Sequence, residues 1–434
     1  MGNQPTKPSE KDAEDLQRNF SRSCARAGKL ISESDVLLLC TGAGFSADSG
    51  LAVYADIAKI QAYSDRTLSY PDICQPHWLE TEPQLFFGFW GGCFNDYRQT
   101  QPHEGYELIA QWRNLKNKTE AAKRIRQAIA KTRAEAATGS TPIVEEPYTV
   151  SGTAGAFFSF TSNVDAHMFD FFPPEEVREC HGNVELWQCS APCCQQIWRA
   201  PAEFLFHVDP ETMLAPAFSV PGEAASPALG IDDAAAASFQ ECDETKACIG
   251  RPLGISRLKT LRYMPTATNP ERWVMNESEE ATNAKGLQEN DDDRTCSNSG
   301  NHPTCGQCKA PARPAILMFG DSAWIDTEEQ SARWEEWSEA VLQLSIPDSD
   351  TKPPLKVCIL EVGCGGNVIT VRANTERIYK QVTSSGGNCT VVRINPELPL
   401  ADNDEYQTDF VSIMSKGLPA LKEIDRFIPR KSKS

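Results

Sequence analysis

One stretch decides the fold: Leu37-Leu38-Leu39-Cys40-Thr41-Gly42-Ala43-Gly44-Phe45-Ser46-Ala47-Asp48-Ser49-Gly50. An apolar, strand-like run ends here in a glycine-rich turn that continues into small and hydroxylated residues. In α/β proteins such a turn lets the main chain approach a phosphate, and the N-terminus of the next helix faces the anion. The spacing is neither G-x-G-x-x-G nor that of a P-loop, so an ordinary tight connection between a strand and a helix is the alternative.

Further apolar runs are expected as strands, and small or polar residues follow each of them. The first strand is expected over 35–40, and the others over 157–161, 315–319, 355–362 and 390–394. Between them the sequence predicts helices over 13–32, 83–97 and 106–135. This alternation is typical of an α/β fold, a Rossmann-like parallel sheet with helices on both faces. The ligand crevice of such a sheet lies outside the carboxyl ends of its strands, where these polar residues gather.

The expected domain organisation follows from shifts in composition. Residues 1–12 are polar and are expected to form a disordered tail. A discontinuous Rossmann-like domain comprises 13–185 and 310–425, with a helical module as an insertion over 83–150. Residues 186–309 are expected to form a small zinc-binding module with a long acidic insertion over 200–304, and 426–434 a basic tail.

Charge and hydropathy exclude several classes of partner. The 434 residues include 60 acidic and 42 basic ones, a formal net charge of −18. Such a field repels nucleic acid and anionic membranes and tolerates basic peptides, although acidity can also serve solubility alone. No apolar run approaches the ~20 residues that span a bilayer, and no secretory signal is present, so we expect an intracellular protein, cytoplasmic or nuclear. The start Met1-Gly2-Asn3-Gln4-Pro5-Thr6 fits N-myristoylation, which would add a weak membrane contact.

Two short-spaced cysteine groups stand out among the 16 cysteines. They are Cys189-x-x-x-Cys193-Cys194 and Cys305-x-x-Cys308. Together they predict a zinc site of four thiolates, with either Cys193 or Cys194 as the second ligand. A redox role for the second pair is less favoured, because Cys305 does not open a helix after a strand.

One histidine is a candidate general base. His181 lies in Glu179-Cys180-His181-Gly182, where a polar context suggests enough exposure to titrate near neutral pH. A surface or hydrogen-bonded histidine without a chemical role is the alternative. His167, near the polar residues after the second strand, could equally be structural.

In their order along the chain, these elements resemble the sirtuin family of NAD-dependent protein deacylases. The resemblance covers roughly 35–420 and is carried by Gly42-Ala43-Gly44-Phe45-Ser46-x-x-Ser49-Gly50, Thr161-Ser162-Asn163-Val164-Asp165-Ala166-His167, His181-Gly182, the two cysteine groups, Arg313-Pro314, Phe319-Gly320-Asp321, the Gly363 turn and Ile394-Asn395-Pro396-Glu397.

The resemblance implies an NAD cofactor, a structural zinc ion and an acyl-lysine protein or peptide as substrate. It makes His181 the general base, which takes a ribose hydroxyl proton, with Asn163 and Asp165 as further catalytic residues. It assigns zinc to Cys189, Cys193, Cys305 and Cys308, and strand-like backbone for the substrate peptide to 318–320. The implied NAD-binding residues are Gly42, Ala43, Gly44, Ser46, Tyr54, Ser162, Asn163, Asp165, Gly363, Cys364, Asn395 and Glu397.

Two departures from the family pattern bear on activity. The usual Ile-Pro-Asp-Phe-Arg after the glycine turn is Leu51-Ala52-Val53-Tyr54-Ala55 here, which keeps an aromatic residue and loses the arginine. The usual glutamine before Asn163 is Ser162. We therefore expect NAD binding more firmly than efficient deacylation. The alternatives are mono-ADP-ribosyl transfer or NAD hydrolysis in the same pocket, and an NAD-binding sensor or scaffold without catalysis.

Overall fold

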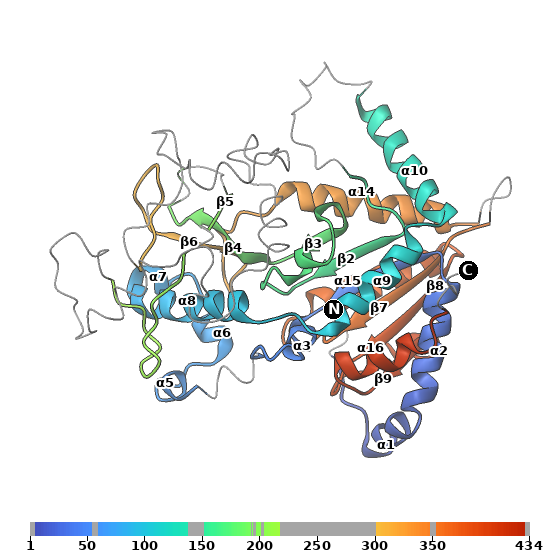
Figure 1. Cartoon of the computed structure of the whole chain (residues 1–434), viewed down its shortest axis with the longest axis horizontal. Coiled ribbons are helices and arrows are strands. Elements are labelled where there is room, and N and C mark those ends of the chain that lie inside the picture. The colour runs from blue at the N-terminus through green and yellow to red at the C-terminus, as the bar shows by residue number, and fades with distance from the viewer. Residues whose placement is uncertain are drawn as a thin grey trace, which may run out of the picture.

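A six-stranded parallel sheet forms the centre of the molecule (Figure 1). The structure, a computed structural model, describes residues 5–53, 60–137, 152–191, 193, 197–200, 204–217, 301–347 and 353–429. The strand order is β3-β2-β1-β7-β8-β9, and every neighbouring pair is parallel. The strands are β1 (Val36–Thr41), β2 (Phe157–Thr161), β3 (Val177–Glu179), β7 (Lys356–Val362), β8 (Asn388–Ile394) and β9 (Phe410–Ile413).

Both faces of this sheet are covered, as a parallel sheet requires. Alternate residues of β1 enter opposite cores: Leu37 and Leu39 pack on one face, and Leu38 packs on the other. The first face is covered by α2 (Phe20–Glu33), α9 (Glu104–Lys116) and α16 (Gly417–Asp425). The second is covered by α10 (Glu120–Ala137), α14 (Glu328–Ser345) and α15 (Thr370–Ser384). The expected α/β class, with helices on both faces of a parallel sheet, is confirmed.

A second, smaller sheet lies beside the first in Figure 1. It is antiparallel, in the order β5-β4-β6, with β4 (Gly182–Cys189), β5 (Ile197–Arg199) and β6 (Ala312–Ile316). The aromatic helix α8 (Pro83–Gln99) packs on it in a third core. Both charges of the ion pair between Arg98 on α8 and Glu185 on β4 are buried, and the two side chains make two hydrogen bonds of 2.9 and 2.6 Å. The pair therefore fixes how α8 sits on the small sheet.

Short helices connect these layers. They are α3 (Ala43–Ala47), α5 (Gln61–Ser64), α6 (Tyr70–Ile73) and α7 (Trp78–Thr81), with single 3-10 turns at η1 (His167–Asp170), η2 (Pro174–Glu176) and η4 (Asp404–Tyr406). Among the described residues, no helix is both long and apolar enough to cross a membrane.

The N-terminal segment differs from the disordered tail that we expected. Helix α1 (Glu10–Arg18) begins inside it, and the Ser9 side chain accepts a hydrogen bond from the Asp12 amide at the helix start. Asn19 separates α1 from α2, so the single helix predicted over 13–32 is two helices. Before α1, Lys7 forms an exposed ion pair of 2.7 Å with Glu397, after β8.

Other predictions are corrected in the strands. The apolar run 315–319 was expected in the parallel sheet, but its first residues belong to β6, antiparallel to β4. A short apolar run carries no information on which sheet it joins. The strands β3, β5 and β9 were missed because each has four residues or fewer, and β4 was missed because its residues, GNVELWQC, do not form an apolar run. The helical segment 83–150 is divided, since α8 packs on the small sheet while α9 and α10 pack on the large one.

Several sequence-based expectations fall outside the described residues. These are the site residue Tyr54 with its neighbour Ala55, the alternative zinc ligand Cys194, most of the acidic insertion (218–300) and the last part of the basic tail (430–434).

Candidate functional site

The glycine turn after β1 packs directly on the turn after β7. The Gly44 amide donates to the Gly363 carbonyl over 2.9 Å, and the Gly42 amide donates to the Val362 carbonyl over 3.1 Å. A Cβ atom at Gly363 would lie 2.2 Å from the Phe45 nitrogen, and one at Gly44 would lie 2.8 Å from the Gly363 Cα. Glycine at these positions is thus required by contact between the two loops, and the Gly44 amide is engaged within the protein.

A buried polar cluster joins the loops after β1 and β2. The Ser46 hydroxyl donates to Asp165 Oδ2 over 2.5 Å, and the Asn163 amide donates to Ser46 Oγ over 2.9 Å. All three side chains are buried, as is neighbouring Ser162. Because β1 and β2 are neighbours in the sheet, the loops at their carboxyl ends meet here. Hydroxyl, amide and carboxylate groups are what a polyhydroxylated ligand needs for hydrogen bonding.

Two buried histidines, His167 and His103, bond to residues of this cluster or next to it. His167 is fully buried, its amide donates to Asp165 Oδ1 over 2.9 Å, and its Nε2 contacts the Tyr97 carbonyl at 2.9 Å. His103 Nδ1 accepts from the Gly105 amide, so its Nε2 donates to the Phe45 carbonyl. Burial lowers the pKa of His103. The structural interpretation of His167 is therefore the one that its contacts support.

Strand β3 brings a buried carboxyl group close to the cluster. Glu179 is buried and accepts from the Asn183 amide over 2.5 Å, while its Oε1 has no hydrogen-bond partner within the described part of the chain. Burial, and secondarily the charge of Asp165, raise the pKa of Glu179 to about 8. A neutral carboxylic acid at physiological pH can donate a hydrogen bond, which a carboxylate cannot. Sequence reasoning missed this residue, although it stands two positions before His181.

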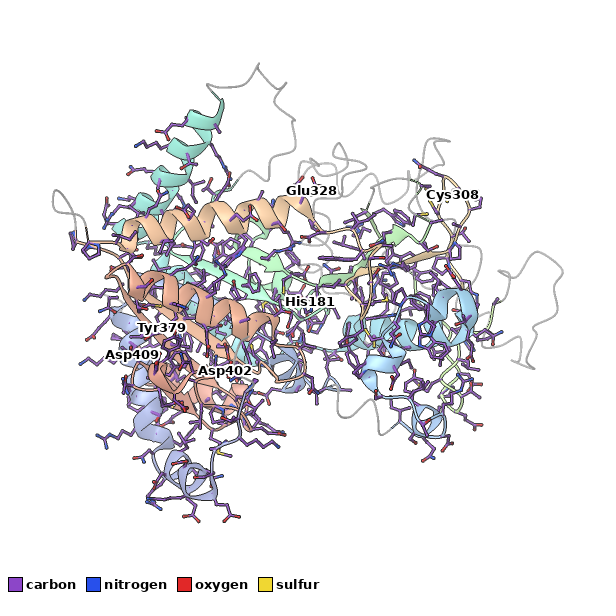
Figure 2. All side chains as sticks on the ribbon, turned by 180° about the vertical axis from the view of Figure 1, so that it is seen from behind. His181, Cys308, Glu328, Tyr379, Asp402 and Asp409 are labelled. Carbon is purple, nitrogen blue, oxygen red and sulfur yellow. The ribbon has the colours of Figure 1, made fainter. Side chains whose placement is uncertain are left out.

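His181 lies in the turn from β3 to β4, near the middle of the molecule, with Cys308 on one side and Asp402 on the other (Figure 2). Its carbonyl accepts from the Leu317 amide over 3.0 Å, and its Nε2 lies 3.2 Å from Thr370 Oγ1. Burial, and then the positive charge of Arg178, lower the pKa of His181 to about 4. The imidazole is thus neutral at pH 7 and has a lone pair with which to accept a proton.

Arg178 is itself held in place. Both of its terminal nitrogens bond Asp326, at 2.7 and 2.6 Å, just before α14. This bidentate pair fixes the positive charge near His181 and ties β3 to the start of α14. The exposure expected for His181 is therefore only partly found, since its ring is half-buried.

The predicted residues after β7 and β8 shape the loops rather than expose side chains. Asn395 donates to the Cys364 carbonyl over 2.8 Å, and its Oδ1 accepts from the amides of Glu397 and Leu398. Cys364 is buried, with its sulfur 3.9 Å from the Cys40 carbonyl. Of this group, only Glu397 has an exposed side chain. Asn395 and Cys364 thus hold the two loops together.

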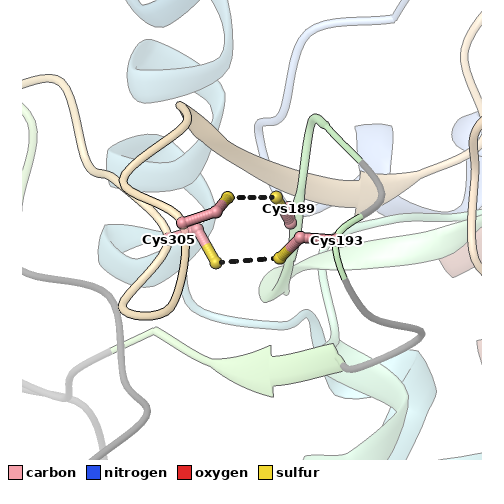
Figure 3. A group of neighbouring side chains, drawn as sticks. Cys189, Cys193 and Cys305 are labelled. Carbon is pink, nitrogen blue, oxygen red and sulfur yellow. Dashed lines mark hydrogen bonds between the residues drawn. The ribbon is translucent and has the colours of Figure 1, made fainter.

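The four cysteines converge at the end of the small sheet (Figure 3). Cys189 and Cys308 are 3.4 Å apart at sulfur, Cys193 and Cys305 are 3.7 Å apart, and all four sulfurs lie within 4.8 Å of one another. Four thiolates about 2.3 Å from one zinc ion in a tetrahedron would be about 3.8 Å apart, so the spacing fits a structural zinc. Of the two alternatives for the second ligand, Cys193 lies in the cluster, and Cys194 is outside the described residues.

Residues 317–319 overlap the segment 318–320 that was expected to offer backbone to a substrate, and they are partly engaged. The Leu317 amide donates to the His181 carbonyl, and the Phe319 amide donates to the Cys74 carbonyl, each over 3.0 Å. The side chains of Leu317 and Phe319 are exposed. This segment therefore lies against His181 with two of its amides already bonded.

Comparison with known proteins finds solved structures of Sir2 homologues. A Sir2 homologue in complex with NAD has a TM-score of 0.44 and 14% identity, over 93% of this chain and 93% of that chain. A Sir2 complex with a p53 peptide and NAD has a TM-score of 0.41 and 13% identity, over 92% of this chain and 95% of that chain. No protein-family profile and no curated protein sequence matches. Similarity at this level does not identify the family, so function is inferred below from the residues.

Proposed function

We propose that this chain is an NAD-dependent protein-lysine deacylase. The observation that carries the proposal is the bonded cluster of Ser46, Asn163 and Asp165, assembled from the loops after two neighbouring parallel strands. The next strand, β3, leads to His181, whose lowered pKa keeps it able to accept a proton at pH 7. This combination, at the carboxyl edge of a Rossmann-like sheet, suits a ribose beside a general base.

Each group has a defined task in this proposal. Asn163 and Asp165 would hold the nicotinamide ribose, with Ser46 orienting the carboxylate through its 2.5 Å hydrogen bond. His181 would take a proton from a ribose hydroxyl. When bound, NAD would supply an electrophilic sugar carbon with nicotinamide as its leaving group. Zinc would be structural, because four thiolates leave no open coordination position.

The acyl-lysine substrate would lie beside 317–319. Leu317 and Phe319 are exposed, and Leu317 is joined to His181 through the backbone. An acyl-lysine needs an apolar path for its side chain and a base near its far end, and these exposed apolar residues belong to the segment that bonds the His181 backbone. The net charge of −18 favours basic protein substrates, in the cytoplasm or the nucleus, over nucleic acid.

The test is incubation of the purified chain with NAD and an acetyl-lysine peptide, followed by mass spectrometry. Bare lysine together with nicotinamide and O-acetyl-ADP-ribose is the expected result. His181→Ala should reduce turnover by about a hundredfold or more while NAD still binds in calorimetry. His77→Ala, an exposed histidine in the short-helix region, is the matched control and should retain full activity.

Other products would redirect the proposal. ADP-ribose on a target protein, or free ADP-ribose without any change in the peptide, would indicate transfer or hydrolysis instead of deacylation. Intact NAD in the presence of measurable binding would indicate a sensor or scaffold. Absence of NAD binding by well-folded protein would reject all three.

A further inference from the structure

The main chain at His181 is held on both sides. The His181 carbonyl accepts from the Leu317 amide, and a Cβ atom at the next residue, Gly182, would lie 1.9 Å from the Ala315 carbonyl oxygen. The backbone of this turn is therefore packed against the segment after β6. What the backbone does not set is the orientation of the imidazole about its own side-chain bonds.

The ring has a single polar side-chain contact among the described residues, and this contact comes from the other side of the site. His181 Nε2 lies 3.2 Å from Thr370 Oγ1. Thr370 is the first residue of α15, the helix that follows β7 and the Gly363 turn. The contact thus joins the base after β3 to the element that follows β7, 189 residues later in the sequence.

We propose that Thr370 is a positioning residue for His181. The Thr370 hydroxyl accepts a hydrogen bond from the Nε2–H of His181, and the lone pair on Nδ1 is then free to act as base. A neutral imidazole carries one N–H and one lone pair, and the partner of one nitrogen decides the role of the other. The opposite arrangement, in which the hydroxyl donates to Nε2, would occupy the lone pair and place the proton on Nδ1. This inference rests on the proposed function for its catalytic meaning, but the tautomer can be measured without any activity.

The positive charges around the His181 imidazole favour its neutral form. Arg178 is the charged group that acts on the imidazole, and it is fixed by its two bonds to Asp326. The positive end of α15 begins at Thr370 and likewise disfavours a charged ring. Thr370 is itself exposed, so water competes for its hydroxyl and the expected effect on rate is modest.

The experiment is nitrogen NMR on the full-length chain with labelled histidine at pH 7. The sequence has six histidines, and the signals missing in His181→Ala assign this one. Wild type should show the proton on Nε2 alone, and Thr370→Val should show a mixture of the two tautomers. Thr370→Ser keeps the hydroxyl and should restore the single tautomer. Thr383→Val, in the last turn of the same helix, is the control and should match wild type.

Two results would overturn the proposal: a proton on Nδ1 in wild type, or the same tautomer ratio in Thr370→Val as in wild type and Thr370→Ser. If the wild type deacylates, kcat in Thr370→Val should fall about fivefold with the KM for NAD unchanged, as expected for one lost hydrogen bond. If the wild type has no deacylase activity, the proposed function fails, and the NMR result still decides whether Thr370 orients the ring.

Discussion

At the scale of the residue, the close contact between Gly363 and the turn at Gly42–Gly44 is the most demanding feature of the site. Gly363 has φ +68°, a conformation that other residues adopt at a cost, and its Cα faces the backbone of the other turn. Any side chain would both strain this conformation and push the two loops apart.

Gly363→Ala should therefore lower the free energy of unfolding by more than about 3 kcal/mol, the sum of left-handed strain and overpacking. The measurement is urea denaturation followed by tryptophan fluorescence. Gly365→Ala is the control two residues away, since a Cβ atom there would meet nothing within 4 Å and should change stability by less than about 1 kcal/mol. Equal stability of the two variants would contradict the packing described here.

At the scale of the element, the sequence was informative wherever an apolar run was long and buried on both sides. The runs predicted at 157–161, 355–362 and 390–394 correspond to β2, β7 and β8. Patterning failed where partners far along the chain decide the outcome. Strand β6 belongs to the small sheet because it pairs with β4, and nothing in the sequence around β6 indicates which strand it pairs with.

In the candidate site, too, some residues could be predicted from the sequence and others could not. Ser46, Asn163 and Asp165 could be found because each follows a recognisable strand, and the structure brings them into one cluster. The four cysteines could be found from spacing, and they do converge. Thr370 could not be found, since a threonine at a helix start carries no sign that a histidine 189 residues earlier will reach it. Nor could the full engagement of Asn395 within its own loop be seen in the sequence.

A zinc ion bound at the cysteine cluster would stabilise the small sheet. Cys189 ends β4, while Cys305 and Cys308 precede β6, and the two strands are antiparallel, so one ion would clamp β4 to β6 at one end of the strand pair. We expect a chelator to increase hydrogen exchange in β4 and β6 and to leave β7 and β8 unchanged, as read by mass spectrometry.

A matched pair of variants checks the ligand set. Cys305→Ser should reduce the zinc content of the purified chain to background, and Cys93→Ser, a half-buried cysteine outside the cluster, should leave it unchanged. Unaltered zinc in Cys305→Ser would show that the cluster is not the metal site.

At the scale of the whole molecule, the net charge of −18 acts on any charged substrate that approaches the protein. Opposite charges steer association, and salt screens this attraction. If the chain deacylates peptides, the KM for a lysine-rich peptide should rise about threefold or more between about 0.05 M and about 0.5 M NaCl. An acidic peptide with the same acyl-lysine is the control, and its KM should stay level or fall. Identical salt responses would mean that the charge plays no part in substrate selection.

The interlocking of the turns at Gly44 and Gly363 has a consequence for reading the history of such chains. Glycine is needed at both positions because a side chain there would clash with the other loop. This steric requirement does not depend on catalysis. A descendant that had lost its chemistry would still keep both. Their presence in a relative therefore records that the scaffold survives. Under the proposed function, the pairing of residues 181 and 370 would be the better record of a catalytic base.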